Sequence, residues 1–305
     1  MIVKTTKTLC PICNAVLEGN IHEEDGSIWL ERSCPEHGHF RDLYWSDAGL
    51  WHKFEQFDSV GRGVETPNVT NLAGCCPEHC GLCENHKSGT LLANIDLTNR
   101  CNLDCDFCFA NARACGYIYE PSFDQIVAML KMLREQKPVP APAVQFSGGE
   151  PTMRDDLMDI IRKAKEIGFP QVQVATNGIK LARDKGYVEE LKAAGLSTVY
   201  LHFDGVSKET NFKFASDEKA IRHCEEIGLG LVLVPTIIKG RNDHEVGDMI
   251  RYATEHIKVV RGVNFQPIAF TGAASEEDVQ RERITIPELL DDIEAQTSGT
   301  IRKAD

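Results

Sequence analysis

From residue 91 onward the 305-residue chain repeats a strand–helix unit, and this repeat constrains the fold more than any other feature. Apart from the first, successive strand-like runs begin 27 to 33 residues apart, and several intervening helix-like stretches end at a glycine. Strands that alternate with helices at this period predict a parallel sheet with right-handed crossovers. The expected strands are Leu91–Leu97, Ala143–Phe146, Gln171–Ala175, Thr198–Phe203, Leu229–Pro235 and Gly262–Pro267. The expected helices are Phe123–Gln136, Asp155–Ile167, Lys185–Ala194, Ser216–Ile227 and Asp243–His256.

Three cysteines with the spacing C-x3-C-x2-C follow the first expected strand, at Cys101, Cys105 and Cys108. Three thiolates in one tight loop can hold three corners of a cubane iron–sulfur cluster and leave the fourth iron open. An open metal position is typical of a reactive site. The alternative is a structural metal knuckle that takes its fourth ligand from elsewhere.

A second motif, residues 147–152 with the sequence SGGEPT, follows the second expected strand. Its two glycines allow the backbone to approach a ligand closely. The adjacent Glu150 can accept charge-assisted hydrogen bonds from an ammonium group. The alternative is a Gly-Gly turn followed by a solvated glutamate.

Together and in this order, the two motifs resemble the radical S-adenosylmethionine (SAM) superfamily. The resemblance implies an α/β fold, a partial (βα)6 radical SAM barrel preceded by a small Cys-rich metal-binding region. It also implies a [4Fe–4S] cluster on Cys101, Cys105 and Cys108 that, once reduced by a donor such as ferredoxin or flavodoxin, cleaves SAM to a 5′-deoxyadenosyl radical. The residues that it places at SAM or the substrate are Phe107, Ser147, Gly148, Gly149, Glu150, Thr152, Asn177 and Asp204.

Two of these residues, Asn177 and Asp204, each follow an expected strand, and the resemblance implies that they lie near the SAM ribose or the substrate. Barrels of this kind place their chemistry at the carboxyl ends of the strands. Each residue is also suited to an ordinary turn or helix cap. His202, two residues before Asp204, is expected to be structural.

The first ninety residues contain a C-x2-C, x20, C-x2-H pattern formed by Cys10, Cys13, Cys34 and His37. Two such knuckles joined by a hairpin, with Ile28–Glu31 as one strand, bring four ligands into a tetrahedron. The Cys3His set suits zinc, with a mononuclear iron as the alternative. His39 could replace His37.

A further C-x3-C-x2-C motif, at Cys76, Cys80 and Cys83, precedes the barrel. No strand comes before it, so we expect an auxiliary [4Fe–4S] cluster rather than the SAM-cleaving one. Cys75, His86 or a distant residue would supply the fourth ligand, and zinc is the alternative.

Composition limits the partners. A net charge of −13 argues against binding to a nucleic-acid backbone. With no signal peptide and no long apolar stretch, the 12 cysteines are expected to serve metals in the cytoplasm. No transmembrane segment is expected, while a small-molecule or lipid substrate and peripheral membrane contact stay open.

The order of the motifs along nearly the whole chain resembles one branch of the superfamily. That branch includes archaeal tetraether lipid synthase and 7,8-dihydro-6-hydroxymethylpterin methyltransferase-like proteins. The resemblance implies hydrogen abstraction, with C–C bond formation on lipid chains as the first expectation. The alternatives are methyl transfer to a pterin, or a truncated iron–sulfur electron-transfer protein without turnover.

The same resemblance divides the chain. We expect a Cys3His zinc-ribbon or rubredoxin-like knuckle at 1–60, an auxiliary cluster-binding linker at 61–90 and the barrel at 91–272. Residues 273–305 are expected to begin a C-terminal extension.

Overall fold

The computed structural model describes residues 2–67, 81–83, 86–108, 116–270 and 276–304. The chain divides into two compact units. The first contains Met1–Val60, Asn68–Cys83 and Ile284–Asp305, and the second contains Gly61–Pro67 and Glu84–Arg283.

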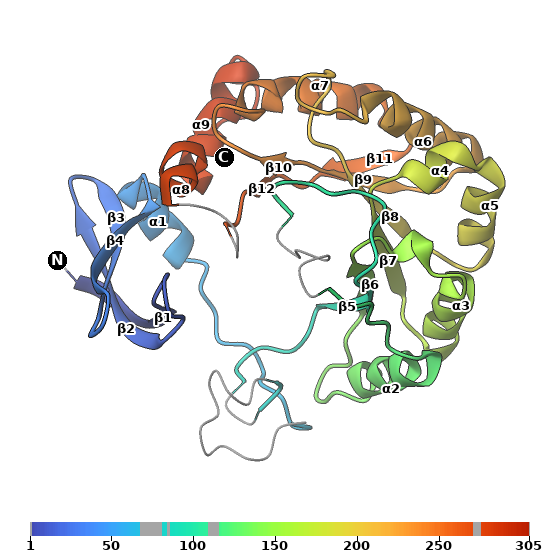
Figure 1. Ribbon diagram of the computed structural model, residues 1–305, viewed down its shortest axis with the longest axis horizontal. Coiled ribbons are helices and arrows are strands. Elements are labelled where there is room, and N and C mark those ends of the chain that lie inside the picture. The colour runs from blue at the N-terminus through green and yellow to red at the C-terminus, as the bar shows by residue number, and fades with distance from the viewer. Residues whose placement is uncertain (1, 68–80, 84–85, 109–115, 271–275, 305) are drawn as a thin grey trace. The chain divides into compact units, whose positions relative to one another are not determined.

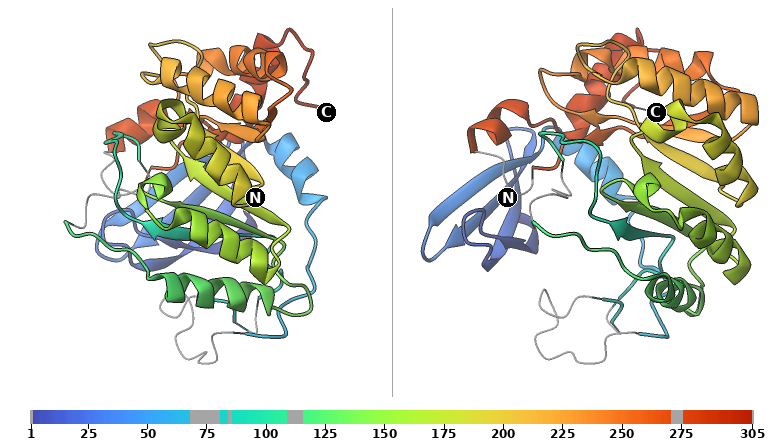
Figure 2. Two further views of the ribbon diagram at one scale, coloured as in Figure 1. Left: turned by 90° about the vertical axis from the view of Figure 1, so that its right-hand side faces the viewer. Right: turned by 45° about the vertical axis from the view of Figure 1, so that its right-hand side comes forward.

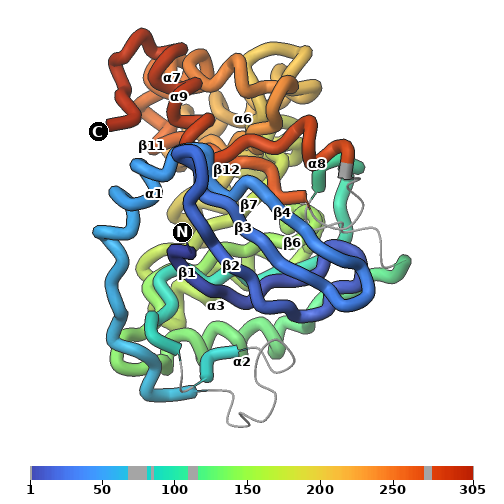
Figure 3. Tube along the Cα trace, turned by 90° about the vertical axis from the view of Figure 1, so that its left-hand side faces the viewer, coloured from blue at the N-terminus to red at the C-terminus, as the bar shows by residue number. Residues whose placement is uncertain are grey.

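The described residues of the first unit form a four-stranded antiparallel sheet in chain order, whose strands run side by side in Figure 3. The second and third strands are joined by Asp25-Gly26, both with positive φ, as a two-residue hairpin turn requires. The expected hairpin is therefore part of a larger sheet. The strands are β1 (Ile2–Leu9), β2 (Val16–Glu24), β3 (Ser27–Cys34) and β4 (Gly38–Trp45).

Two helices belong to this first unit. Helix α1 (Ala48–Glu55) begins after Asp47, whose carboxylate accepts a hydrogen bond from the Leu50 amide at 2.9 Å. Helix α9 (Ile286–Gln296) begins with a capping box of Thr285 and Glu288. A small core stabilises the sheet and α1; its members are Ile21, Ile28, Leu30, Trp45, Ala48 and Trp51.

The described residues of the second unit form a six-stranded sheet with the order β11-β9-β8-β7-β6-β5, all parallel. The sheet curves, and the helices that alternate with its strands lie along the outer side of the curve (Figures 1 and 2). This architecture confirms the predicted α/β fold. The strands are β5 (Leu92–Thr98), β6 (Ala143–Gly148), β7 (Gln171–Thr176), β8 (Thr198–His202), β9 (Leu231–Val234) and β11 (Val260–Val263).

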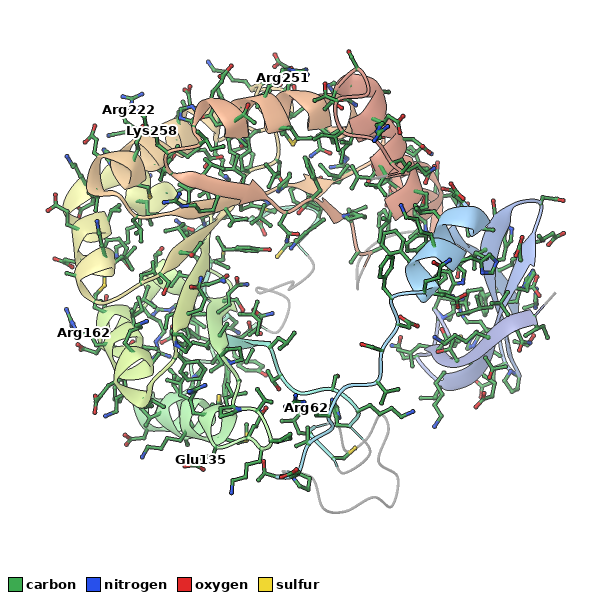
Figure 4. All side chains as sticks on the ribbon, turned by 180° about the vertical axis from the view of Figure 1, so that it is seen from behind. Arg62, Glu135, Arg162, Arg222, Arg251 and Lys258 are labelled. Carbon is green, nitrogen blue, oxygen red and sulfur yellow. The ribbon has the colours of Figure 1, made fainter. Side chains whose placement is uncertain are left out.

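The helices of the second unit bury apolar side chains and keep charged ones in solvent. Helices α3 and α6 end at Gly168 and Gly228, which have positive φ values of 101° and 71°. In Figure 4 Arg162, Arg222 and Arg251 point outward from α3, α6 and α7. The helices are α2 (Phe123–Arg134), α3 (Leu157–Ile167), α4 (Ile179–Arg183), α5 (Lys185–Ala193), α6 (Phe214–Ile227), α7 (Val246–Glu255) and α8 (Glu276–Glu282), with 3-10 turns η1 (Pro151–Met153) and η2 (Asp243–Glu245). Among the described residues, no helix combines the length and apolarity needed to cross a bilayer.

The prediction of one continuous sixth strand, Gly262–Pro267, is wrong. The chain forms β11 and then a separate short strand, β12 (Gln266–Pro267), which pairs with β10 (Thr236–Ile237). Pro235 lies between β9 and β10 and has no N–H to donate to a continued ladder. The neighbouring strand bends with it, since the Gln266 amide donates to the Pro235 carbonyl at 2.9 Å.

Candidate active site and metal centre

Four metal-ligating side chains converge in the first unit. The ligand atoms of Cys10, Cys13, Cys34 and His37 all lie within 4.8 Å of one another. His37 Nδ1 is 3.7 Å from Cys10 Sγ and 3.5 Å from Cys34 Sγ. The predicted Cys3His set is thus brought together in a geometry that fits one tetrahedral ion.

The backbone around this cluster favours the metal-binding thiolate of Cys10. Burial raises the pKa of Cys10, but backbone N–H groups of Cys13 and Ile12 stabilise its charged sulfur and bring the pKa down to about 7. His39 faces elsewhere, because its Nδ1 lies 3.3 Å from Ser33 Oγ. His37, and not His39, is therefore the histidine of this cluster.

A cavity of about 300 Å³ opens at the carboxyl-terminal side of the parallel sheet in the second unit. The cysteine motif after β5 and the glycine motif after β6 both line it. Its other walls come from β7, β8, β9 and the β10–β12 pair. Lining residues from the predicted site are Cys101, Cys105, Phe107, Cys108, Ser147, Gly148, Gly149, Glu150 and Asn177.

The cysteine loop presents three thiols to this cavity. The Leu103 amide lies 3.4 Å from Cys101 Sγ, and the Cys108 amide donates to the Cys105 carbonyl at 3.3 Å. Burial raises the pKa of Cys105 to about 11, and negative charge on Cys108 and Asp204 acts in the same direction. A neutral thiol of this kind releases its proton when a metal binds, so the three side chains suit a cluster.

Gly148 and Gly149 bring two backbone segments together. A Cβ atom on Gly148 would lie 2.2 Å from the Thr98 carbonyl oxygen, and one on Gly149 would lie 2.2 Å from the Arg100 carbonyl oxygen. The Gly149 and Glu150 amides donate to these same carbonyls, each at 2.7 Å. The two glycines therefore allow the backbone after β6 to approach the residues that begin the cysteine loop, and not only a ligand.

Glu150 is almost fully buried, with 1% of its surface exposed. Its Oε1 accepts hydrogen bonds from the Thr152 amide at 3.1 Å, the Thr152 hydroxyl at 2.6 Å and the Thr176 hydroxyl at 2.7 Å. Its Oε2 accepts one from the Asn177 amide at 2.8 Å. The carboxylate holds η1 against the end of β7, and Oε2 retains capacity for a further donor such as an ammonium group.

Asn177 ties the end of β7 to the cysteine loop. Its Nδ2 donates to Asn102 Oδ1 at 2.7 Å, and its Oδ1 accepts from the Ile179 amide at 3.1 Å. Thr152, in contrast, is buried behind Glu150 and is not among the lining residues. Its predicted contact with SAM stays a prediction, and in this structure its contacts are to Glu150.

Asp204 supports the cavity wall from behind. Its Oδ1 accepts from the Thr236 amide at 3.0 Å, and its Oδ2 lies 2.9 Å from His202 Nε2. His202 itself lines the cavity, with its ring centroid 6.0 Å from that of Phe107. The structural role expected of His202 stays a prediction, and Asp204 is not among the lining residues.

Sequence motifs missed several other lining residues, which lie within strands rather than at their ends. The available signal was the alternation of side chains along each strand, which turns every second residue away from the helices. These residues are Asn94, Gln145 and Tyr200. The auxiliary motif is different: Cys76 and Cys80 lie outside the described residues, and Cys83 is buried. An auxiliary cluster thus stays a prediction.

Comparison with known families agrees with this geometry. Residues 95–253 match the radical SAM superfamily, which covers the parallel sheet from β5 to α7. The chain belongs to the radical SAM superfamily. Residues 2–46 match the HMPTM N-terminal zinc ribbon domain, so this radical SAM chain also has an N-terminal zinc ribbon. Membership implies a [4Fe–4S] cluster and SAM as cofactors.

Among curated relatives, a 7,8-dihydro-6-hydroxymethylpterin dimethyltransferase of Methanocaldococcus jannaschii is 50% identical over 99% of this chain and 60% of its own length. A GTP 3′,8-cyclase of Limosilactobacillus fermentum is 31% identical over 65% of this chain and 59% of its own length. This radical SAM chain thus spans about three fifths of both relatives. Among solved structures, HydG, a maturase of the [FeFe]-hydrogenase, matches 70% of this chain and 51% of its own with a TM-score of 0.52 at 13% identity, which supports the fold alone.

Proposed function

We propose that this radical SAM chain carries the SAM-cleaving core of an enzyme that transfers methyl groups to a pterin. The observation that carries the proposal is the 50% identity, across 99% of the chain, to a pterin dimethyltransferase. The expectation of C–C bond formation on lipid chains finds no counterpart among these relatives. The chain spans only 60% of that relative. That this chain has the relative's complete activity is therefore a proposal as well.

Within this proposal, Cys101, Cys105 and Cys108 hold the cluster, and the polar groups around Glu150 receive the methionine end of SAM. When bound and reduced, the cluster supplies the electron that cleaves SAM. The chain's own residues orient SAM and exclude water. Gly148 and Gly149 fix the cysteine loop against β6, while Asn177 fixes it against β7.

The remaining assignments belong to the same proposal. Phe107, Ser147 and Thr152 would support SAM, with Asp204 acting through His202. Cys10, Cys13, Cys34 and His37 would hold zinc, and Cys76, Cys80 and Cys83 would contribute to an auxiliary cluster. A donor such as ferredoxin or flavodoxin would supply electrons, and the boundaries 1–60, 61–90, 91–272 and 273–305 remain proposed domains.

The test is production of 5′-deoxyadenosine from SAM by the anaerobically reconstituted, dithionite-reduced chain, with and without 7,8-dihydro-6-hydroxymethylpterin and a methyl donor. We expect cleavage in the wild type, a methylated pterin by mass spectrometry, and neither product from Cys105→Ala. Cys105→Ala should also lose iron while it keeps the zinc held by the first unit. Cys224→Ala is the matched control, because Cys224 is a buried cysteine within α6 away from the cavity.

Cleavage by Cys105→Ala would contradict the cluster assignment. Cleavage without any methylated pterin, in the presence of a methyl source and a competent donor, would contradict the proposed substrate. A cluster that is reduced by dithionite but does not cleave SAM would instead indicate that the chain is an electron carrier.

A further inference from the structure

The inner face of the parallel sheet is polar where its outer face is apolar. In β6, Val144 and Phe146 are fully buried, and Gln145 lies between them in the sequence. Successive side chains of a strand point to opposite faces, so Gln145 points away from both neighbours. Consistent with this, Gln145 lines the cavity that also contains the three cysteines.

Gln145 has a carboxamide neighbour on the adjacent strand. Asn94 of β5 pairs in register with Gln145, and it also lines the cavity. The next inward-facing pair toward the carboxyl ends is Asp96 and Ser147, whose side chains are hydrogen-bonded to each other at 2.7 Å. The Asn94–Gln145 pair therefore lies one inward-facing pair farther from the carboxyl ends of the strands than Ser147, where the glycine motif begins.

The deeper pair carries an unused acceptor. Gln145 is 8% exposed, and its Oε1 is buried without a hydrogen-bond partner among the residues that the structure describes. A buried polar group without a partner costs about 1–3 kcal/mol. Because the Gln145 side chain lines the cavity, a ligand that donates a hydrogen bond to this oxygen would remove that cost.

The wall beyond β7 contributes further polar groups. Tyr200 of β8 lines the cavity, and its hydroxyl accepts a hydrogen bond from Asn264 Nδ2. Burial raises the pKa of Tyr200, so its hydroxyl stays protonated at neutral pH. Gln266 adds a further carboxamide to the lining.

These groups suit a neutral ring with donors and acceptors on its edge. A carboxamide offers one acceptor and two donors, so neighbouring carboxamides can pair with an adjacent amine and carbonyl. An alkyl chain in the same place would leave Gln145 Oε1 unpaired, and a site built for hydrogen bonds discriminates strongly against such a ligand.

We propose that Asn94 and Gln145, with Tyr200 two strands away on β8, bind the amino–oxo edge of a planar neutral heterocycle of the pterin type and so determine substrate specificity. This inference rests on the proposed function, which it deepens by naming the residues that recognise the ring. The recognition lies on the inner face of β5, β6 and β8, separate from the cysteine and glycine motifs.

The test is equilibrium dialysis of 6-hydroxymethylpterin against the reconstituted chain with SAM present. The second probe is 6-hydroxymethyllumazine, in which an oxo group replaces the 2-amino group that would donate to Gln145. We expect the wild type to bind the pterin at least about tenfold more tightly than the lumazine. Gln145→Leu should weaken pterin binding about tenfold or more and abolish the preference between the probes.

Gln136→Leu is the matched control. Gln136 is 3% exposed, both of its side-chain polar atoms lack a partner in the described part of the chain, and it is not among the lining residues. We expect this variant to bind both probes as the wild type does. Asn94→Leu, at an exposed cavity position, repeats the test should Gln145→Leu fail to fold.

No pterin binding by the folded wild type, or an unchanged preference in Gln145→Leu and Asn94→Leu, would overturn the inference. If the chain methylates pterin while these variants keep the wild-type preference, the proposed function stands and only the recognition site is wrong. Selective probe binding that depends on Gln145, without any SAM cleavage, would instead overturn the function and support the recognition site.

Discussion

A single carboxylate, that of Glu150, joins three segments of the candidate site. Its four hydrogen bonds come from the residues that follow it and from the end of β7. The motif predicted that Glu150 belongs to the site. Its partners Thr176 and Asn177 could not be predicted in the same way, because they depend on how β6 and β7 align in the sheet.

Replacing Glu150 with glutamine should destabilise the second unit. In Glu150→Gln one oxygen becomes an NH2 group, and with Oε1 accepting three bonds the amide would take the place of Oε2 and face the Asn177 N–H. Two facing donors leave a buried group unsatisfied, which costs about 1–3 kcal/mol. The measurement is the free energy of unfolding in urea.

The exposed Glu189 on α5 provides the control, since Glu189→Gln should change that free energy by less than about 0.5 kcal/mol. Equal stabilities of Glu150→Gln and wild type would mean that these four contacts contribute nothing measurable.

At the level of elements, the sequence predicts the parallel strands well and the antiparallel ones poorly. The strands β6, β7 and β8 are short and contain regularly placed, buried apolar residues, and their positions match the prediction within two residues at each end. In contrast β1 is largely exposed, β2 buries only alternate residues, and both are rich in polar residues, so no apolar run marks them. The break after β11 was missed because it follows from Pro235 on the neighbouring strand.

The junction of β6 with the cysteine loop is an element-scale feature that Gly149 makes possible. Gly149→Ala would place a Cβ atom 2.2 Å from the Arg100 carbonyl oxygen, and a backbone atom cannot move aside as a side chain can. We expect a loss of about 1–3 kcal/mol in unfolding free energy, together with reduced iron content after reconstitution.

Gly262→Ala is the matched control within β11, because a Cβ atom there would meet nothing within 4 Å. It should leave iron content unchanged. If Gly149→Ala has the same iron content and unfolding free energy as the wild type, the contact between the cysteine loop and the end of β6 is not needed for cluster binding or stability.

At the level of the whole chain, its two ends belong to one compact unit. Lys303 Nζ lies 2.9 Å from Asp47 Oδ2 and 2.9 Å from Asp291 Oδ1, so it links the start of α1 with the residues around α9. Ser46 and Thr285 add a hydroxyl–hydroxyl hydrogen bond of 2.8 Å. The sequence predicted only that residues 273–305 begin a C-terminal extension, and motif order alone could not show that α9 packs with the zinc ribbon's unit.

This link should make the first unit's stability depend on pH. A hydrogen bond from Lys303 lowers the pKa of Asp47, helped by the Leu50 amide. A carboxyl whose pKa is lower in the folded state adds stability above its unfolded pKa, and that stability is lost as pH falls through the folded pKa.

Because both side chains are partly exposed, Lys303→Met should cost only about 0.5–1 kcal/mol at pH 7. The difference between the wild type and the variant should shrink as pH falls below about 3.9, the ordinary aspartate value, and disappear once pH is below the lowered pKa of Asp47 in the folded chain. The measurement is the free energy of unfolding of each chain at the two pH values, with Lys163→Met in the exposed Lys163–Glu166 pair as control. A difference between wild type and Lys303→Met that persists undiminished at low pH would mean that Lys303 stabilises the unit by packing, and not through the charge of Asp47.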